Sequence, residues 1–115
     1  MSSLTLYHNP RCSKSRAALA LLQQRGIQPD IVLYLQTPPD QATLRQLLQQ
    51  LALPARTLLR SKEPEYAEAG LSAQSSEADI IAALARYPKL IERPIASNGK
   101  RAVIGRPPEQ VLTLL

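Results

Sequence analysis

The sequence predicts an α/β fold with a mixed four-stranded sheet, and three observations along its 115 residues support this. The first third alternates strand-like and helix-like segments, as a βαβ unit does. The middle third has helical periodicity only. The last third holds two strand-like segments around an Asn-Gly pair, followed by a proline-led helix start. The predicted order is therefore βαβ, a helical insert, and ββα.

The βαβ unit begins with residues 4–8, which alternate in polarity and end at Asn9-Pro10, as a strand does. In residues 13–24 the apolar side chains recur at helical spacing, and Gly26 follows as a stop signal. Residues 30–35 are almost continuously apolar. We therefore expect them to form a buried strand parallel to the first.

The helical insert is predicted to span residues about 38–90. Thr37 precedes two prolines, which is typical of a helix start with Thr37 as the N-cap. A short helix is expected to contain Arg60, and an amphipathic helix is expected over residues 77–87. Because a chain this short buries one core, residues 1–115 are predicted to form a single domain that includes the insert.

The Asn98-Gly99 pair is the preferred centre of a two-residue type I′ turn, so the strand-like segments on its two sides are expected to form a hairpin. Counting back from this turn sets Ser97 opposite Lys100 and makes Arg106 a diagonal neighbour of Arg93. Diagonal Cβ atoms lie about 7 to 8 Å apart. We therefore expect the two guanidiniums to converge on one anion.

A last helix is predicted after Pro107-Pro108, with Val111, Leu112 and Leu115 on its apolar face. The complete order of elements is that of a thioredoxin-like fold with a helical insert. A different four-stranded α/β sandwich with the same order is the alternative, because periodicity does not separate the two.

Composition and charge limit the function classes. The chain is 44% hydrophobic and 20% charged, as soluble globular proteins are. No apolar run approaches the roughly 18 residues that cross a bilayer, and no secretory signal is evident, so we expect a cytoplasmic protein without a membrane partner. The net charge of +5 favours an anionic ligand, but four tyrosines without Phe or Trp offer little base-stacking surface. We therefore expect no nucleic-acid partner.

The chain has one cysteine, Cys12, and one histidine, His8. This count excludes an internal disulfide and a four-ligand zinc site, so no metal is predicted. A Cys-x-x-Cys motif is excluded because residue 15 is Ser15. A phosphatase loop is excluded because only three residues separate Cys12 from Arg16.

Cys12 lies where the first strand meets the first helix, and the free N–H groups of a helix start favour negative charge. Arg11, Lys14 and Arg16 surround it. Such surroundings are typical of a reactive thiolate, and a buried, inert cysteine is the alternative.

Three further positions stay open on spacing alone. Arg60 could join an anion site or only cap a helix. The Arg93-Pro94 bond could be cis, as about 5 to 6% of such bonds are. His8 could tune Cys12 or only end a strand.

Five segments together resemble one known family. They are YHNPRCSKSR at 7–16, YLQTPP at 34–39, LLR at 58–60, IERPI at 91–95 and IGRPPE at 104–109. In order and separation they resemble the motifs of the glutaredoxin-coupled arsenate reductase family over essentially the whole chain. Ser13-Lys14 and the end at Leu115 depart from the longer characterised members, as in a short branch of that family.

The resemblance implies a thioredoxin-like fold and a cysteine nucleophile that attacks an arginine-bound arsenate. The nucleophile it implies is Cys12, the oxyanion-binding residues are Arg60, Arg93 and Arg106, and the supporting residues are His8, Ser15 and Pro94, the last after a cis bond. Glutathione is implied as co-substrate and glutaredoxin as protein partner. We further expect a monomer without a tightly bound cofactor.

Two other functions remain open from the sequence. A monothiol glutathione-dependent oxidoreductase would need only Cys12 and Ser15, with the arginines holding glutathione carboxylates. A redox-blind regulator similar to the RNA-polymerase-binding Spx proteins would share the fold, although those proteins commonly carry a second cysteine.

Overall fold

The computed structural model describes residues 4–115, and these form two compact units. One unit is the described part of Met1–Thr37 together with Arg93–Leu115, and the other is Pro38–Glu92. The second unit covers nearly the same residues as the predicted helical insert. The assignment of the whole chain to one domain stays a prediction.

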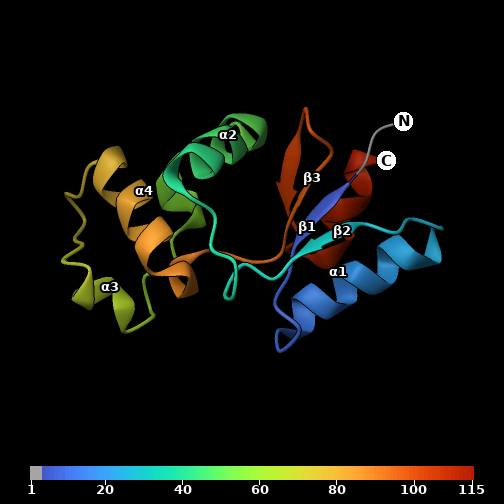
Figure 1. The fold of residues 1–115 in the computed structure, drawn as a ribbon, viewed down its shortest axis with the longest axis horizontal. Coiled ribbons are helices and arrows are strands. Elements are labelled where there is room, and N and C mark those ends of the chain that lie inside the picture. Colours follow the sequence, from blue (N-terminus) through green and yellow to red (C-terminus); the bar gives the residue numbers. More distant parts are fainter. Residues whose placement is uncertain (1–3) are drawn as a thin grey trace. The chain divides into compact units, whose positions relative to one another are not determined.

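The first unit is built on a mixed four-stranded sheet with the order β2-β1-β3-β4 (Figure 1). Its strands are β1 (Thr5–Tyr7), β2 (Asp30–Val32), β3 (Ile95–Ser97) and β4 (Ala102–Ile104). β1 pairs in parallel with β2 and antiparallel with β3, and β3 pairs antiparallel with β4. The predicted α/β fold with a thioredoxin-like mixed sheet is confirmed.

One face of this sheet is covered by α1 (Ser13–Gln24) and by η3 (Pro108–Leu114), a 3-10 helix. The two helices and the strands share a buried apolar cluster of Leu4, Leu6, Ala18, Leu22, Ala96 and Val111. The bounds of α1 agree with the prediction. Leu115 is 55% exposed, so its predicted place on the buried face was wrong. With three residues per turn, Leu114 follows Val111 on one face of η3 and Leu115 does not.

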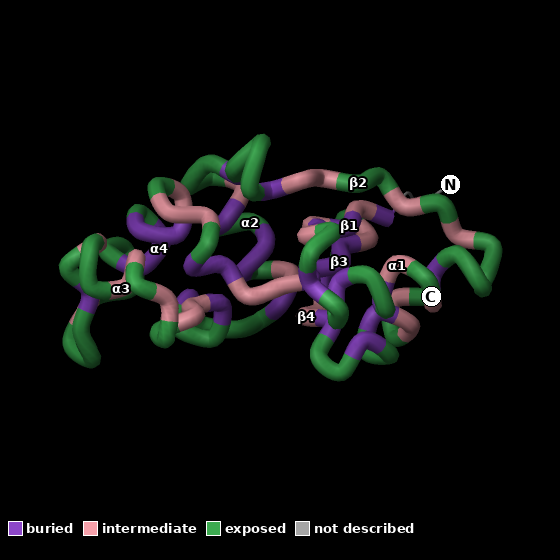
Figure 2. Tube along the Cα trace, turned by 90° about the horizontal axis from the view of Figure 1, so that it is seen from below, coloured by how far each residue is buried: buried purple, intermediate pink, exposed green. Residues whose placement is uncertain are grey.

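β2 is an edge strand and not the buried strand that its apolar sequence predicted. Asp30 and Ile31 are exposed, and Val32 is intermediate (Figure 2). The apolar run alone does not indicate whether a strand lies inside a sheet or at its edge. The buried residue of this region is Tyr34, which follows the strand.

The β3–β4 hairpin has a register two residues away from the predicted one. Ser97 pairs with Ala102 and not with Lys100, so the turn is centred one residue further along. The cause is the side chain of Asn98, whose Oδ1 accepts hydrogen bonds from the N–H groups of Lys100 and Arg101 at 2.9 and 2.8 Å. Because strand side chains alternate with a period of two, this shift leaves each side chain on its predicted face.

The second unit is helical. Its elements are α2 (Gln41–Leu51), η1 (Ala55–Leu58), α3 (Glu65–Glu68), α4 (Glu77–Arg86) and η2 (Pro88–Leu90). The N-cap of α2 is Asp40, whose carboxylate accepts from the Thr43 N–H at 2.8 Å, and the prediction of Thr37 was wrong. A proline disfavours the helical conformation of the residue before it, so the Pro38-Pro39 pair prevents the helix from starting before Asp40.

The charge of the chain is divided unevenly between the units. Eight of the 14 Lys and Arg residues and two of the 9 Asp and Glu residues belong to the unit with the sheet, which therefore carries +6. The helical unit holds the other six cations and seven anions and carries −1. The unit that contains Cys12 thus attracts anions.

Candidate active site

The loop between β1 and α1 places Cys12 at the N-cap of the helix. The N–H of Cys12 donates to the carbonyl of Asn9 at 2.9 Å, and its own carbonyl accepts from the Arg16 N–H at 3.0 Å. The side chain of Asn9 accepts from the Arg11 N–H at 3.0 Å. This tight turn holds the sulfur at the start of α1, where unpaired N–H groups favour negative charge.

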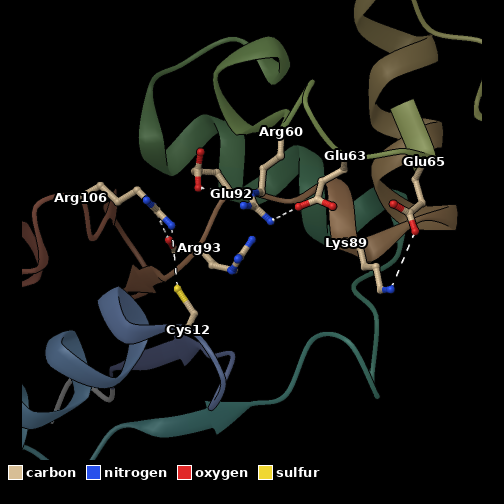
Figure 3. Close-up of polar contacts among 8 residues, drawn as sticks. All are labelled: Cys12, Arg60, Glu63, Glu65, Lys89, Glu92, Arg93 and Arg106. Atoms are coloured by element: carbon tan, nitrogen blue, oxygen red, sulfur yellow. Dashed lines mark hydrogen bonds and ion pairs between the residues drawn. The ribbon is translucent and has the colours of Figure 1, made fainter. Parts of the chain in front are cut away.

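Arg106, just beyond β4, reaches this sulfur. Its Nη2 lies 3.9 Å from Cys12 Sγ, and its Nε donates to the carbonyl of Arg93 at 2.8 Å (Figure 3). Two contacts from one planar guanidinium fix its orientation. Cys12 itself is only 9% exposed, which strengthens the attraction between a thiolate and this cation.

Arg93 and Arg106 lie opposite each other beyond the ends of β3 and β4. The hydrogen bond from the Gly105 N–H to the Pro94 carbonyl, 2.8 Å long, continues the ladder toward them. The Arg93-Pro94 bond is cis, as the resemblance implied, and so is the Arg106-Pro107 bond, which we did not predict. In Figure 3 the guanidinium of Arg93 points away from Cys12 and Arg106. The convergence of the two guanidiniums on one anion stays a prediction.

His8 and Ser15 form a buried pair beneath the loop, with Nδ1 and Oγ 2.5 Å apart. Ser15 Oγ also accepts from the Asn9 N–H at 3.0 Å, so its own proton is available for Nδ1. Burial, and after it the charge of Arg16, lowers the pKa of His8. The imidazole is therefore neutral at pH 7, and the pair anchors the loop that carries Cys12. The spacing of seven residues gave no indication of this contact.

Arg60 lies in the helical unit, two residues after the end of η1, so it does not cap that helix. Its Nη1 is 2.7 Å from Glu63 Oε1, and its Nε is 3.8 Å from Glu92 Oε1 (Figure 3). Its backbone N–H donates to the carbonyl of Leu90 at 2.8 Å. The assignment of Arg60 to an oxyanion site stays a prediction.

The elements of residues 4–115 also bear on a membrane or metal function. None of their helices combines the length and the apolar character that a membrane crossing needs. No three side chains of His, Cys, Asp or Glu in this range come together as metal ligands. The predicted absence of a metal stays a prediction.

An N-cap cysteine facing an arginine is consistent with oxyanion chemistry, and comparison with known proteins identifies the family. The model of the ArsC family matches residues 7–114. The chain belongs to the ArsC family.

Relatives of this ArsC chain cover nearly its whole length. It is 54% identical to YfgD of Escherichia coli K12 over 112 residues, 96% of this chain and 94% of that protein. It is 44% identical to a protein named arsenate reductase from Neisseria meningitidis serogroup A, over 100% of both chains. A solved structure named arsenate reductase from Vibrio cholerae has 49% identity and a TM-score of 0.94, and covers 99% of this chain and 98% of that one.

Proposed function

We propose that this ArsC protein is an arsenate reductase whose nucleophile is Cys12. The contact between Arg106 and the Cys12 sulfur carries the proposal, because it sets a cation for an oxyanion beside a nucleophile. The relative named arsenate reductase that matches the whole chain at 44% identity supports arsenate as the substrate.

In the first step the Cys12 thiolate attacks the arsenic(V) of arsenate. A sulfur–arsenic bond forms, and one arsenic oxygen takes up protons from solution and leaves as water. Guanidinium groups offset the charge of the remaining oxygens. Arg106 has this role, and we propose Arg93 and, from the family resemblance, Arg60 as further anion-binding residues.

Glutathione supplies the second sulfur, because the chain has no other cysteine. Its thiolate attacks the Cys12 sulfur, and the electron pair of the sulfur–arsenic bond stays with arsenic, which leaves as arsenite, arsenic(III). Cys12 and glutathione remain as a mixed disulfide, which a glutaredoxin thiol resolves by exchange. The reducing thiol pool of the cytoplasm would sustain this cycle.

His8 and Ser15 serve as positioning residues in this proposal. A neutral imidazole and a hydroxyl that also binds the Asn9 N–H hold the loop without adding a charge beside the sulfur. Pro94 supports the site from the position directly before β3, where its carbonyl accepts from the N–H of Gly105.

The test is arsenate reduction with glutathione and glutaredoxin, monitored as the oxidation of NADPH by added glutathione reductase. Cys12→Ser should reduce turnover to background, and Ser13→Ala, at the exposed neighbouring position, should keep it. If Cys12→Ser still reduced arsenate, the mechanism would be wrong. If the unaltered protein turned over a glutathionylated disulfide but not arsenate, it would be a monothiol oxidoreductase instead.

A further inference from the structure

A cleft of about 250 Å³ lies on the Cys12 loop and has no role in the anion chemistry proposed above. One wall is the loop itself, with Asn9 and Arg11. The other wall is the segment after β2, with Leu33, Leu35 and Gln36. All of these residues belong to the unit with the sheet.

The lining combines three kinds of group. Leu35 is 39% exposed and presents an apolar side chain to water, the amide of Gln36 is also exposed, and Arg11 adds a positive charge. A small site with an apolar wall and a few polar groups binds an amphipathic ligand of matching charge. This cleft suits a short anionic peptide.

The cations around Cys12 form two groups. Arg106 is held by the sulfur and by a backbone carbonyl, and Arg16 Nη1 donates to the carbonyl of Pro10 at 3.1 Å. Arg11 and Lys14 are exposed, and within residues 4–115 their side chains make no hydrogen bond or ion pair. Arg11 therefore keeps its charge and its donors for a ligand in the cleft.

We propose that this cleft is the subsite for the thiol co-reactant, a small anionic thiol peptide of the glutathione type, and that Arg11 pairs with one of its carboxylates. The inference rests on the proposed function, because it assigns a place to the co-reactant of the same cysteine. Cys12 does not line the cleft, but Arg11 directly precedes it and their Cα atoms lie about 3.8 Å apart, so the thiol of a ligand held by Arg11 has only a short distance to span. The charge of +6 on this unit favours the approach of an anion.

The step that the subsite serves can be measured without arsenate. With oxidised glutathione as the probe, the Cys12 thiolate attacks one sulfur, the disulfide bond breaks, and one glutathione leaves as its thiolate. The product is a mixed disulfide of Cys12 and glutathione, which mass spectrometry detects. Bis(2-hydroxyethyl) disulfide undergoes the same exchange but carries no charge.

The experiment compares the rates of these two reactions in the full chain. Arg11→Gln should slow modification by oxidised glutathione about 2- to 5-fold, as the loss of one exposed ion pair does, and leave the uncharged disulfide unaffected. Leu35→Ser should also lower the preference for glutathione. Arg25→Gln is the matched control, because Arg25 is an exposed arginine of the same unit at the end of α1.

An equal effect of Arg11→Gln on both disulfides, or no effect on either, would overturn the subsite. Added salt should lower the preference of the unaltered protein for oxidised glutathione more than it lowers that of Arg11→Gln. If the protein did not reduce arsenate but still reacted faster with oxidised glutathione than with the uncharged disulfide, and this preference depended on Arg11, the proposed function would be wrong and the subsite would be supported. If it reduced arsenate and Arg11→Gln changed neither the preference nor the KM for glutathione, the subsite alone would fall.

Discussion

The change Arg106→Gln tests how far one cation stabilises the thiolate of Cys12. The guanidinium nitrogen lies 3.9 Å from the sulfur. At about 4 Å two unit charges attract by about 1 kcal/mol in water and about 4 kcal/mol at an effective dielectric constant of 20. Cys12 is 9% exposed but Arg106 is exposed, so we expect about 1 to 2 kcal/mol. This corresponds to a roughly 5- to 30-fold slower alkylation of Cys12.

The assay is the rate of Cys12 alkylation by iodoacetamide, measured over the pH range in which the rate still rises with pH, because only the thiolate reacts. Arg106→Lys should give an intermediate rate. A lysine keeps the charge, but it has no fork that could hold the Arg93 carbonyl and the sulfur together.

The control is Arg101→Gln, at the other end of β4, where the side chain donates to the Thr113 carbonyl at 3.1 Å. It should alkylate as the unaltered protein does. If Arg106→Gln also alkylated at the unaltered rate, the contact would not stabilise the thiolate, and the proposed function would lose the observation that carries it.

Three more predictions follow from contacts in the two units. Gly105→Ala should lower the free energy of unfolding by about 1 to 3 kcal/mol, because the added Cβ would lie 2.7 Å from Cγ of Pro94. An unchanged midpoint of thermal unfolding would contradict this packing. Because the pKa of His8 is lowered in the folded protein, the unfolded chain binds more protons at pH values between the folded pKa and the ordinary 6.5. The urea concentration at the midpoint of unfolding should therefore be lower at pH 5.5 than at pH 7.5, and this difference should be smaller in His8→Gln. Glu63→Gln removes the carboxylate that lies 2.7 Å from Arg60. If Arg60 binds the oxyanion as proposed, this change should strengthen the protection that added sulfate gives Cys12 against alkylation. Glu65→Gln, which removes a 3.9 Å ion pair that does not involve Arg60, should leave that protection unchanged.

The parts of the fold set by local sequence were predictable. The helix of residues 13–24 has the bounds that its periodicity and Gly26 indicate. The hairpin was found, but its register was not, because the Asn98 side chain bonds the backbone two and three residues ahead and so moves the centre of the turn. The edge position of β2 depends on the order of strands, which no local pattern contains.

The candidate site was predictable to a similar degree. The N-cap position of Cys12 followed from a strand, a proline and a helix in succession. The nearness of Arg106 to Cys12 was implied by the resemblance, whereas the hairpin argument related Arg106 only to Arg93. The His8–Ser15 pair and the carboxylates around Arg60 depend on side-chain directions in three dimensions, and sequence spacing does not report these.

If Cys12 is the nucleophile that we propose, its low exposure limits which reductants can act on it directly. A residue only 9% exposed offers little surface to another protein, whereas a tripeptide thiol is small enough to enter. Once bound through a disulfide, the tripeptide adds a second sulfur further from the loop. In the proposed cycle a protein reductant would then meet the sulfur of the tripeptide and not that of Cys12, so the small thiol would act as a relay between a buried nucleophile and a partner too large to reach it.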